Sequence, residues 1–134
     1  MIKNLSHIGI AVENLENSIN IFKNLLNQSD YHTEKVESQK VNLAIFKLQN
    51  FNLELLEPTL DDSPIKKFLD NKGEGIHHIS FEVEDIKSEL ERLKNNGFKL
   101  INEQPVMGAE GKLIAFVHPK STNGVLIELS QKEK

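Results

Sequence analysis

The sequence contains no cysteine and no tryptophan, and it has a single tyrosine among its 134 residues. Without cysteine, disulfide bonds and thiolate metal ligands are excluded, so any bound metal ion must be held by histidine and carboxylate groups. No apolar run approaches the roughly 20 residues that a membrane-spanning helix requires. The sequence therefore predicts a protein that does not span a membrane.

A dominant charge of one sign is also absent. The 16 Lys and Arg residues and the 20 Asp and Glu residues give a net charge of −4, and the lysines are dispersed along the chain. This balance argues against nucleic acid as a partner, although it leaves room for a local basic patch. Residues 1–4 lead into a strand-like pattern without the apolar core of a signal peptide, so we expect a cytoplasmic protein.

What the sequence does contain is an internal repeat. The segment SHIGIAVENLENSINIF, beginning at Ser6, returns as HHISFEVEDIKSELERL, beginning at His77. His7 then matches His78, 71 positions later (78 − 7). A second echo pairs NFNLELLE with GVLIELSQ and matches Glu54 with Glu128, 74 positions apart (128 − 54). The chain looks like one module written twice, with one His near the start and one Glu near the end of each copy.

Both copies show the same predicted order of elements, βαβββ. Apolar alternation predicts strands and a 3.6-residue apolar period predicts helices, and Asn14 and Asp85 each stand where a helix N-cap belongs. The connector between the copies holds a short predicted helix at 65–69. The predicted strands are 5–12, 31–37, 41–48 and 51–56 in the first copy and 76–83, 98–102, 112–118 and 124–129 in the second.

A chain of this length forms one ordinary domain, and each half is too small to be comfortable alone. We therefore expect a single domain over residues 1–134, with module 1 at about 1–57, a connector at about 58–74 and module 2 at about 75–131.

The four repeat-matched residues are a candidate metal site. Glu54 and Glu128 each stand between two apolar residues, so each acid faces away from its neighbours' side of the strand. Taken singly, a His or Glu in a strand is more often an ordinary polar residue than a ligand. Four such residues in repeat register reverse that expectation, because two imidazoles and two carboxylates converge if the copies face each other. His77 matches Ser6 rather than a His, and we interpret it as a structural or ligand-orienting residue.

Several separated strings occur in an order typical of a known family: LELLEP followed by DSPI, then GIHHISFEVEDI, FVHPK and GVLIEL. On these strings the sequence resembles the vicinal oxygen chelate (glyoxalase/bleomycin resistance/dioxygenase) superfamily, and within it the methylmalonyl-CoA epimerase family, over nearly the whole chain. The resemblance implies an α+β fold in which two tandem βαβββ modules form an open, U-shaped β cup with helices outside.

The resemblance also implies a divalent metal ion in the cup. Carried over by matched position, its ligands are His7, Glu54, His78 and Glu128. Nitrogen and oxygen donors without sulfur suit a borderline or hard divalent ion. We expect Co2+, with Mn2+, Ni2+ or Zn2+ as alternatives.

The activity that the resemblance implies is the interconversion of (R)- and (S)-methylmalonyl-CoA, by a homodimer that acts in propionate metabolism. Loss of the α-proton places negative charge on the thioester oxygen, which a metal ion stabilises, and inversion requires acid/base groups on both faces of the α-carbon. Glu128 and Glu54 are the candidate catalytic residues. Some family members carry a Glu at the position where this sequence has Leu43. The sequence departs from the family pattern there, so the resemblance does not fix which residue is the second acid/base group. Candidate substrate-binding residues are Lys112, in the loop MGAEGK, Lys120, in the string HPK, and His77.

Four other interpretations stay open at this point. A glyoxalase-like metal-dependent isomerase or lyase shares the four-ligand logic, whereas an extradiol dioxygenase needs two His and one carboxylate, which a second carboxylate ligand argues against. A non-enzymatic small-ligand-binding protein of the same fold could dispense with the ligands. A purely structural subunit would leave the repeat-matched polar residues unexplained.

Overall fold

The computed structural model describes residues 1–133, which divide into two compact units. Unit 1 comprises the described part of Met1–His7 and His78–Lys134, and unit 2 comprises Ile8–His77. Two strands contribute residues to both units. These are β1 (Ile2–Ala11), which passes from unit 1 to unit 2 after His7, and β5 (Gly75–Val83), which passes from unit 2 to unit 1 after His77.

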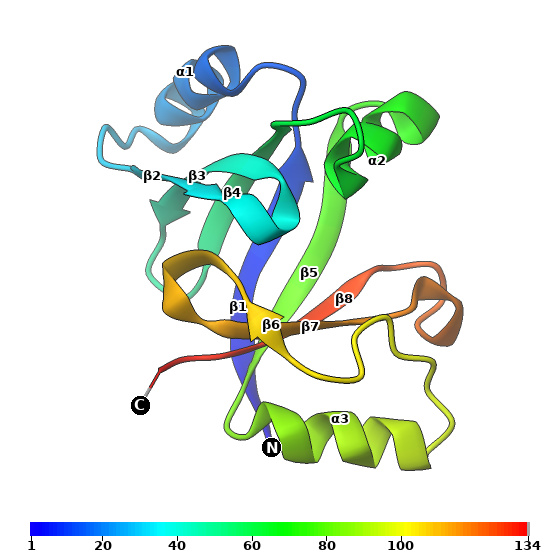
Figure 1. The fold of residues 1–134 in the computed structure, drawn as a ribbon. Helices are drawn as coiled ribbons and strands as arrows, with labels where there is room; N and C mark the ends of the chain where they lie inside the picture. Colours follow the sequence, from blue (N-terminus) through cyan, green and yellow to red (C-terminus); the bar gives the residue numbers. More distant parts are fainter. Residues whose placement is uncertain (134) are drawn as a thin grey trace. The chain divides into compact units, whose positions relative to one another are not determined.

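Unit 2 contains the second half of β1 and the helices α1 (Leu15–Leu26) and α2 (Pro64–Lys72), together with the strands β2 (His32–Val36), β3 (Val41–Lys47) and β4 (Asn52–Pro58) (Figure 1). The strand order is β2-β3-β4-β1, and β3 is antiparallel to both β2 and β4. A 3-10 turn, η1 (Glu37–Gln39), joins β2 to β3.

Unit 1 contains most of β5, then α3 (Ile86–Asn95), β6 (Val106–Met107), β7 (Leu113–Val117) and β8 (Ile127–Gln131), with the 3-10 turns η2 (Ala109–Gly111) and η3 (Pro119–Ser121). Its strand order is β5-β8-β7-β6; β5 and β8 run parallel and β7 is antiparallel to β8 and β6. This repeats the order β1-β4-β3-β2 of the first module. The predicted duplication of a βαβββ unit is confirmed.

The helices begin where their capping residues predict. The Asn14 side chain accepts a hydrogen bond from the backbone N–H of Asn17, and the Asp85 side chain accepts one from that of Ser88. Each bond satisfies one of the free N–H groups of the first helical turn. The connector helix is longer than predicted, Pro64–Lys72 rather than 65–69, because Ser63 caps it and Pro64 occupies its first position.

One strand prediction was wrong. Residues 98–102 form no regular strand: an isolated bridge joins Leu100 to Val117, a few further backbone hydrogen bonds run to the region of β7, and the edge strand is the two-residue β6. The side-chain oxygen of Asn102 accepts the backbone N–H of Phe116 at 2.8 Å, and the backbone N–H of Lys99 donates to the Ser121 hydroxyl at 2.9 Å. Side chains therefore take hydrogen bonds that a continuous strand would have formed through its backbone.

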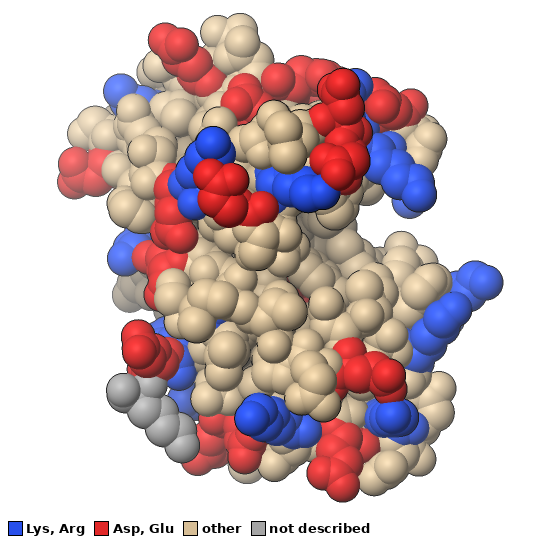
Figure 2. All heavy atoms as spheres, in the orientation of Figure 1, with Lys and Arg blue, Asp and Glu red and all other residues tan. Residues whose placement is uncertain are grey.

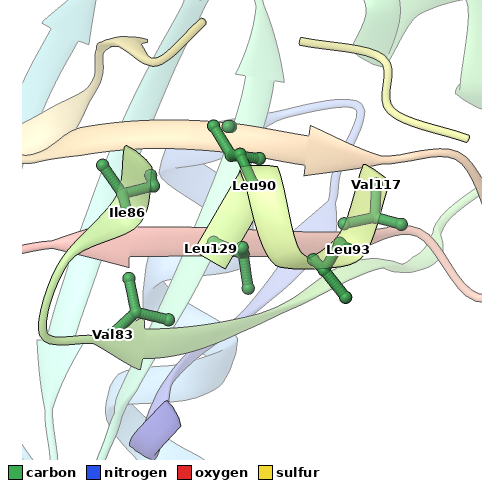
Figure 3. Close-up of a cluster of buried hydrophobic side chains, with 7 residues drawn as sticks. Val83, Ile86, Leu90, Leu93, Val117 and Leu129 are labelled. Atoms are coloured by element: carbon green, nitrogen blue, oxygen red, sulfur yellow. The ribbon is translucent and has the colours of Figure 1, made fainter. Parts of the chain in front are cut away.

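Each unit buries one apolar face of its sheet under a helix, α3 in unit 1 and α1 in unit 2. In unit 1, Figure 3 shows α3 lying over β5, β7 and β8, with its apolar side chains on the sheet. Strand alternation sends the neighbours of these apolar residues, including His78, Ser80 and Glu128, to the opposite face. The α3 cluster consists of the buried residues Val83, Ile86, Leu90, Leu93, Ala115, Val117 and Leu129. Its counterpart in unit 2, the α1 cluster, is built on Val12, Ile19, Ala44, Phe46, Leu53 and Leu55.

The surface agrees with the dispersed charge of the sequence. Figure 2 shows Lys and Arg side chains interspersed with Asp and Glu side chains on both units in the view shown. Among the described residues, no helix combines the length and the apolar character that crossing a membrane would take.

Candidate metal centre

Three of the four repeat-matched residues meet in unit 1. His7 comes from β1, His78 from β5 and Glu128 from β8, and their side chains are almost fully buried, at 5%, 4% and 4% exposure. The two imidazole Nε2 atoms lie 2.9 Å apart. The Nε2 of His7 is 3.2 Å from Oε2 of Glu128, and the Nε2 of His78 is 3.8 Å from Oε1. Two nitrogens and a carboxylate thus converge on one point within a buried sheet face.

The local packing fixes the two rings. The imidazoles of His7 and His78 meet edge to face, with centroids 5.0 Å apart, and the His78 ring makes a similar contact with Phe116 at 5.7 Å. The Ser6 hydroxyl lies 3.2 Å from Nδ1 of His7. If Nδ1 carries the ring hydrogen, it donates to the hydroxyl, and the lone pair of Nε2 is on the side of the ring that faces His78 and Glu128. The His7 ring is therefore held ready to act as a ligand through Nε2.

The carboxylate of Glu128 is held in its ionised form. Burial raises the pKa of this group, but the close contact and charge of His7, the charge of His78 and the nearby Ser80 hydroxyl outweigh it and lower the pKa to about 2. Oε2 is nevertheless a buried oxygen to which no described group donates a hydrogen bond, because the contact from His7 is close in distance without a hydrogen-bonding direction. Such an atom is costly to bury unless a further positively charged or donating group completes it.

These features fit a divalent metal ion. Donor atoms bound to one ion at about 2.0–2.2 Å lie roughly 3 to 3.5 Å from one another, and the closest approaches between the three side chains are 2.9, 3.2 and 3.8 Å. One ligand atom from each lies within 4.8 Å of the others. The donor set is two imidazoles and one carboxylate, which suits ions such as Co2+, Mn2+, Ni2+ and Zn2+.

The fourth repeat-matched residue belongs to unit 2. Glu54 lies on β4 opposite Ile45 of β3 and is buried at 4% exposure. It stands on the face of its sheet away from the α1 cluster, since its neighbours Leu53 and Leu55 are part of that cluster. The Glu54 carboxylate is therefore not on a solvent-facing side of β4, which is where a Glu in an amphipathic strand ordinarily lies.

The remaining predicted residues lie as follows. In unit 2, the His77 ring meets the Phe68 ring of α2 edge to face at 5.1 Å. In unit 1, the ammonium group of Lys112 lies 3.5 Å from a carboxylate oxygen of Glu110, and Lys120 is exposed in η3. Position 43 on β3 is a leucine, buried at 3% exposure, and therefore supplies no carboxylate.

Sequence reasoning did not find Ser6 or Ser80. Ser6 precedes a candidate ligand, and Ser80 follows His78 by two positions, which places it on the same face of β5. The alternation of β5 could have signalled Ser80, since a strand residue in step with His78 must face the same way. The pairing of Ser80 with Glu128 of β8, however, is visible only in the structure.

Comparison with known proteins places these residues in a family. The profile of the Glyoxalase/Bleomycin resistance/Dioxygenase superfamily matches residues 6–116. An ethylmalonyl-CoA/methylmalonyl-CoA epimerase of Cereibacter sphaeroides is 40% identical over 133 residues, which cover 98% of this chain and 99% of that protein.

Solved structures agree with the sequence comparison. A variant of the Streptomyces coelicolor methylmalonyl-CoA epimerase in complex with 2-nitronate-propionyl-CoA has a TM-score of 0.95 at 34% identity, covering 98% of this chain and 96% of that one. A methylmalonyl-CoA epimerase in complex with methylmalonyl-CoA and NH4+ has the same TM-score at 33% identity and the same coverage. The predicted α+β fold of two tandem βαβββ modules is confirmed. The chain belongs to the methylmalonyl-CoA epimerase family of the glyoxalase/bleomycin resistance/dioxygenase superfamily.

Proposed function

We propose that the chain is an isomerase that interconverts (R)- and (S)-methylmalonyl-CoA by removing and returning the α-proton. The observation that carries this proposal is the convergence of His7, His78 and Glu128 in a chain 40% identical to an epimerase across its whole length. The α-proton of methylmalonyl-CoA lies between two carbonyl groups, which make it acidic. Its removal and return therefore require stabilisation of the negative charge on the thioester oxygen and one acid/base group on each face of the α-carbon.

His7, His78 and Glu128 would hold a divalent ion, with Glu54 of unit 2 as a proposed fourth ligand. When bound, such an ion supplies the positive charge that stabilises negative charge on the thioester oxygen after proton loss. The two imidazoles are buried, so they hold their ring nitrogens in place with little competition from water. We propose Co2+ as the ion, with Mn2+, Ni2+ or Zn2+ as alternatives.

Glu128 and Glu54 are the proposed proton-transfer residues, one for each face of the α-carbon. Leu43 cannot take this role because its side chain has no titratable group. The lowered pKa of Glu128 keeps its carboxylate ionised and able to accept a proton, although it also makes the group a weak base. The symmetry of the repeat supplies one carboxylate from each module.

Lys112, Lys120 and His77 are proposed to contact the CoA portion of the substrate. Lys120 is exposed and adjoins the turn at His118, whose Nδ1 accepts the backbone N–H of Lys120 at 3.0 Å. Lys112 already neighbours Glu110, so a phosphate group would compete with that carboxylate for the ammonium group.

Further parts of the proposal concern the whole protein. We propose that residues 1–134 work as a single domain, that the active form is a homodimer, and that the enzyme acts in the cytoplasm in propionate metabolism. Sedimentation velocity tests the assembly and cell fractionation tests the location.

Isotope exchange tests the activity directly. The metal-loaded protein is incubated with methylmalonyl-CoA in deuterated water, and deuterium at C2 is followed by mass spectrometry together with the ratio of epimers. We expect metal-dependent exchange and inversion that a His78→Ala variant loses and a His32→Ala variant keeps, because His32 is a largely exposed residue of β2. No exchange with Co2+, Mn2+, Ni2+ or Zn2+ present would refute the epimerase assignment.

A further inference from the structure

The buried face around Glu128 holds a second polar atom without a described partner. Ser80 is completely buried, and its hydroxyl oxygen accepts or donates no hydrogen bond within residues 1–133. The same is true of Oε2 of Glu128. Two such atoms on one sheet face need an explanation, because each loses its hydrogen bonds to water on burial.

The strand register brings these two residues together. Ser80 of β5 and Glu128 of β8 are Cα partners in the parallel pair, and both residues lie on the face opposite the α3 cluster. The hydroxyl is close enough to be among the groups that lower the pKa of Glu128 against the opposing effect of burial. Both belong to unit 1, as do His7 and His78.

A carboxylate that binds a cation through one oxygen leaves the other oxygen in need of a donor. In a buried site that donor must come from the protein or from an ordered water molecule, and it fixes the rotation of the carboxylate. Because a hydroxyl rotates freely about its Cβ–Oγ bond, Ser80 can present its hydrogen to either oxygen of the neighbouring Glu128.

We infer that Ser80 is a positioning residue for Glu128: in the metal-loaded protein its hydroxyl donates a hydrogen bond to the Glu128 carboxylate and holds one oxygen toward His7 and His78. This inference rests on the proposed metal centre. It assigns Ser80 no contact with the substrate and no part in moving the proton.

Metal affinity provides the test, because it is independent of turnover. Co2+ binding to the metal-free protein is measured by titration calorimetry, and the visible absorption of bound Co2+ reports on the ligand arrangement. We expect Ser80→Ala to weaken Co2+ binding about tenfold, the lower end of the range for loss of a group that orients a ligand. We expect Ser80→Thr, which keeps the hydroxyl, to restore affinity to within about threefold of the parent and to restore the parent spectrum.

Ser130 supplies the matched control. It is equally buried, at 1% exposure, and lies on the same face of β8, but its partner in the register is Glu82 rather than Glu128. Ser130→Ala therefore removes an identical group one step away and should leave Co2+ affinity unchanged.

The outcomes separate the two levels of the proposal. A parent protein that binds Co2+ while Ser80→Ala binds it equally well would overturn the role of Ser80 alone. Equal weakening by Ser80→Ala and Ser130→Ala would also overturn it, because the effect would then follow from packing. A parent that binds none of the four ions would overturn the metal centre and the role of Ser80 together.

Discussion

His7 and His78 place their Nε2 atoms 2.9 Å apart on a buried face of unit 1. These two residues occupy equivalent positions in the two copies of the repeat, so residues that match in the sequence are also neighbours in space. Two neutral imidazoles at this distance share at most one hydrogen, and two protonated ones repel each other. A divalent cation beside both nitrogens would take up both lone pairs, and Glu128 would neutralise one of its two charges.

A bound metal ion should therefore stabilise the fold. At a free Co2+ concentration about 100 times its dissociation constant, we expect the free energy of unfolding to rise by about 2.7 kcal/mol if the unfolded chain binds no metal. The His7→Ala variant should lose this increment, because only His78 and Glu128 of the unit 1 group then remain. Urea denaturation with and without Co2+ measures the difference.

His32→Ala serves as the control for general effects of removing a histidine, since the His32 side chain is 57% exposed. It should keep the full stabilisation by Co2+. Stabilisation that survives in His7→Ala would show that the ion binds elsewhere.

Removing the carboxylate of Glu54 should separate proton exchange from inversion. Glu54→Gln is close to isosteric and leaves His7, His78 and Glu128 in place, so we expect the variant to exchange the α-proton of one epimer with deuterium while inverting it at least tenfold more slowly. The two epimers are supplied separately in deuterated water, and exchange and inversion are followed in parallel by mass spectrometry and chromatography.

Glu128→Gln should have the complementary effect, with exchange of the other epimer preserved if metal is supplied at saturation. A proportional loss of exchange and inversion for both epimers in Glu54→Gln would contradict a role in proton transfer and leave Glu54 as a ligand only.

The apolar cluster under α3 should be the main local source of stability in unit 1. Leu90 is 3% exposed and packs with Val83, Val117 and Leu129 (Figure 3). We expect Leu90→Ala to lower the free energy of unfolding by about 2–5 kcal/mol, through lost burial and the cavity left behind. Ile101→Ala is the control, because Ile101 of the same unit is 51% exposed. Equal losses in urea denaturation would argue against this cluster as the stabilising element.

The repeat made much of this architecture predictable. Caps and apolar periodicity predict α1 and α3 closely, alternation predicts β1 but places its start three residues late (5 rather than 2), and the two echoes identify His7, His78, Glu54 and Glu128 as a set. Register between strands is a different matter, because it depends on contacts between distant parts of the chain. The parallel pairing that sets Ser80 beside Glu128 has no local signal in either strand.

The erroneous strand at 98–102 has a related cause. Its apolar residues fit a strand pattern, but the Asn102 side chain occupies the backbone N–H of Phe116. A side-chain hydrogen bond can thus replace one backbone bond of a regular ladder, while the carbonyl of Phe116 still accepts the backbone N–H of Ile101 at 2.8 Å. Periodicity describes which face of a segment is buried, whereas hydrogen-bond competition decides whether the segment joins the sheet.

The metal-free protein should lose stability in acid through Glu128. The pKa of this carboxyl is lowered from 4.5 to about 2 in the folded state, where His7 and His78 outweigh the opposing effect of burial. Because the folded pKa lies below the unfolded one, the ionised group contributes stability that is fully present above about pH 4.5 and is lost as the pH falls toward 2. Urea denaturation of the metal-free protein from about pH 2.5, inside the window between these pKa values, to about pH 6, above it, measures this slope.

Glu128→Gln has no carboxyl to titrate at this position, so its stability should fall less steeply over the same range, and it should be less stable than the parent at pH 6. Glu91→Gln is the matched control, because Glu91 is an exposed residue of α3 in the same unit. It should retain the parent slope. Between about pH 4.5 and pH 2.5, Glu128 keeps its charge in the folded protein but not in the unfolded one. If Glu128→Gln and the parent lose stability in parallel over this interval, ionised Glu128 does not stabilise the metal-free fold.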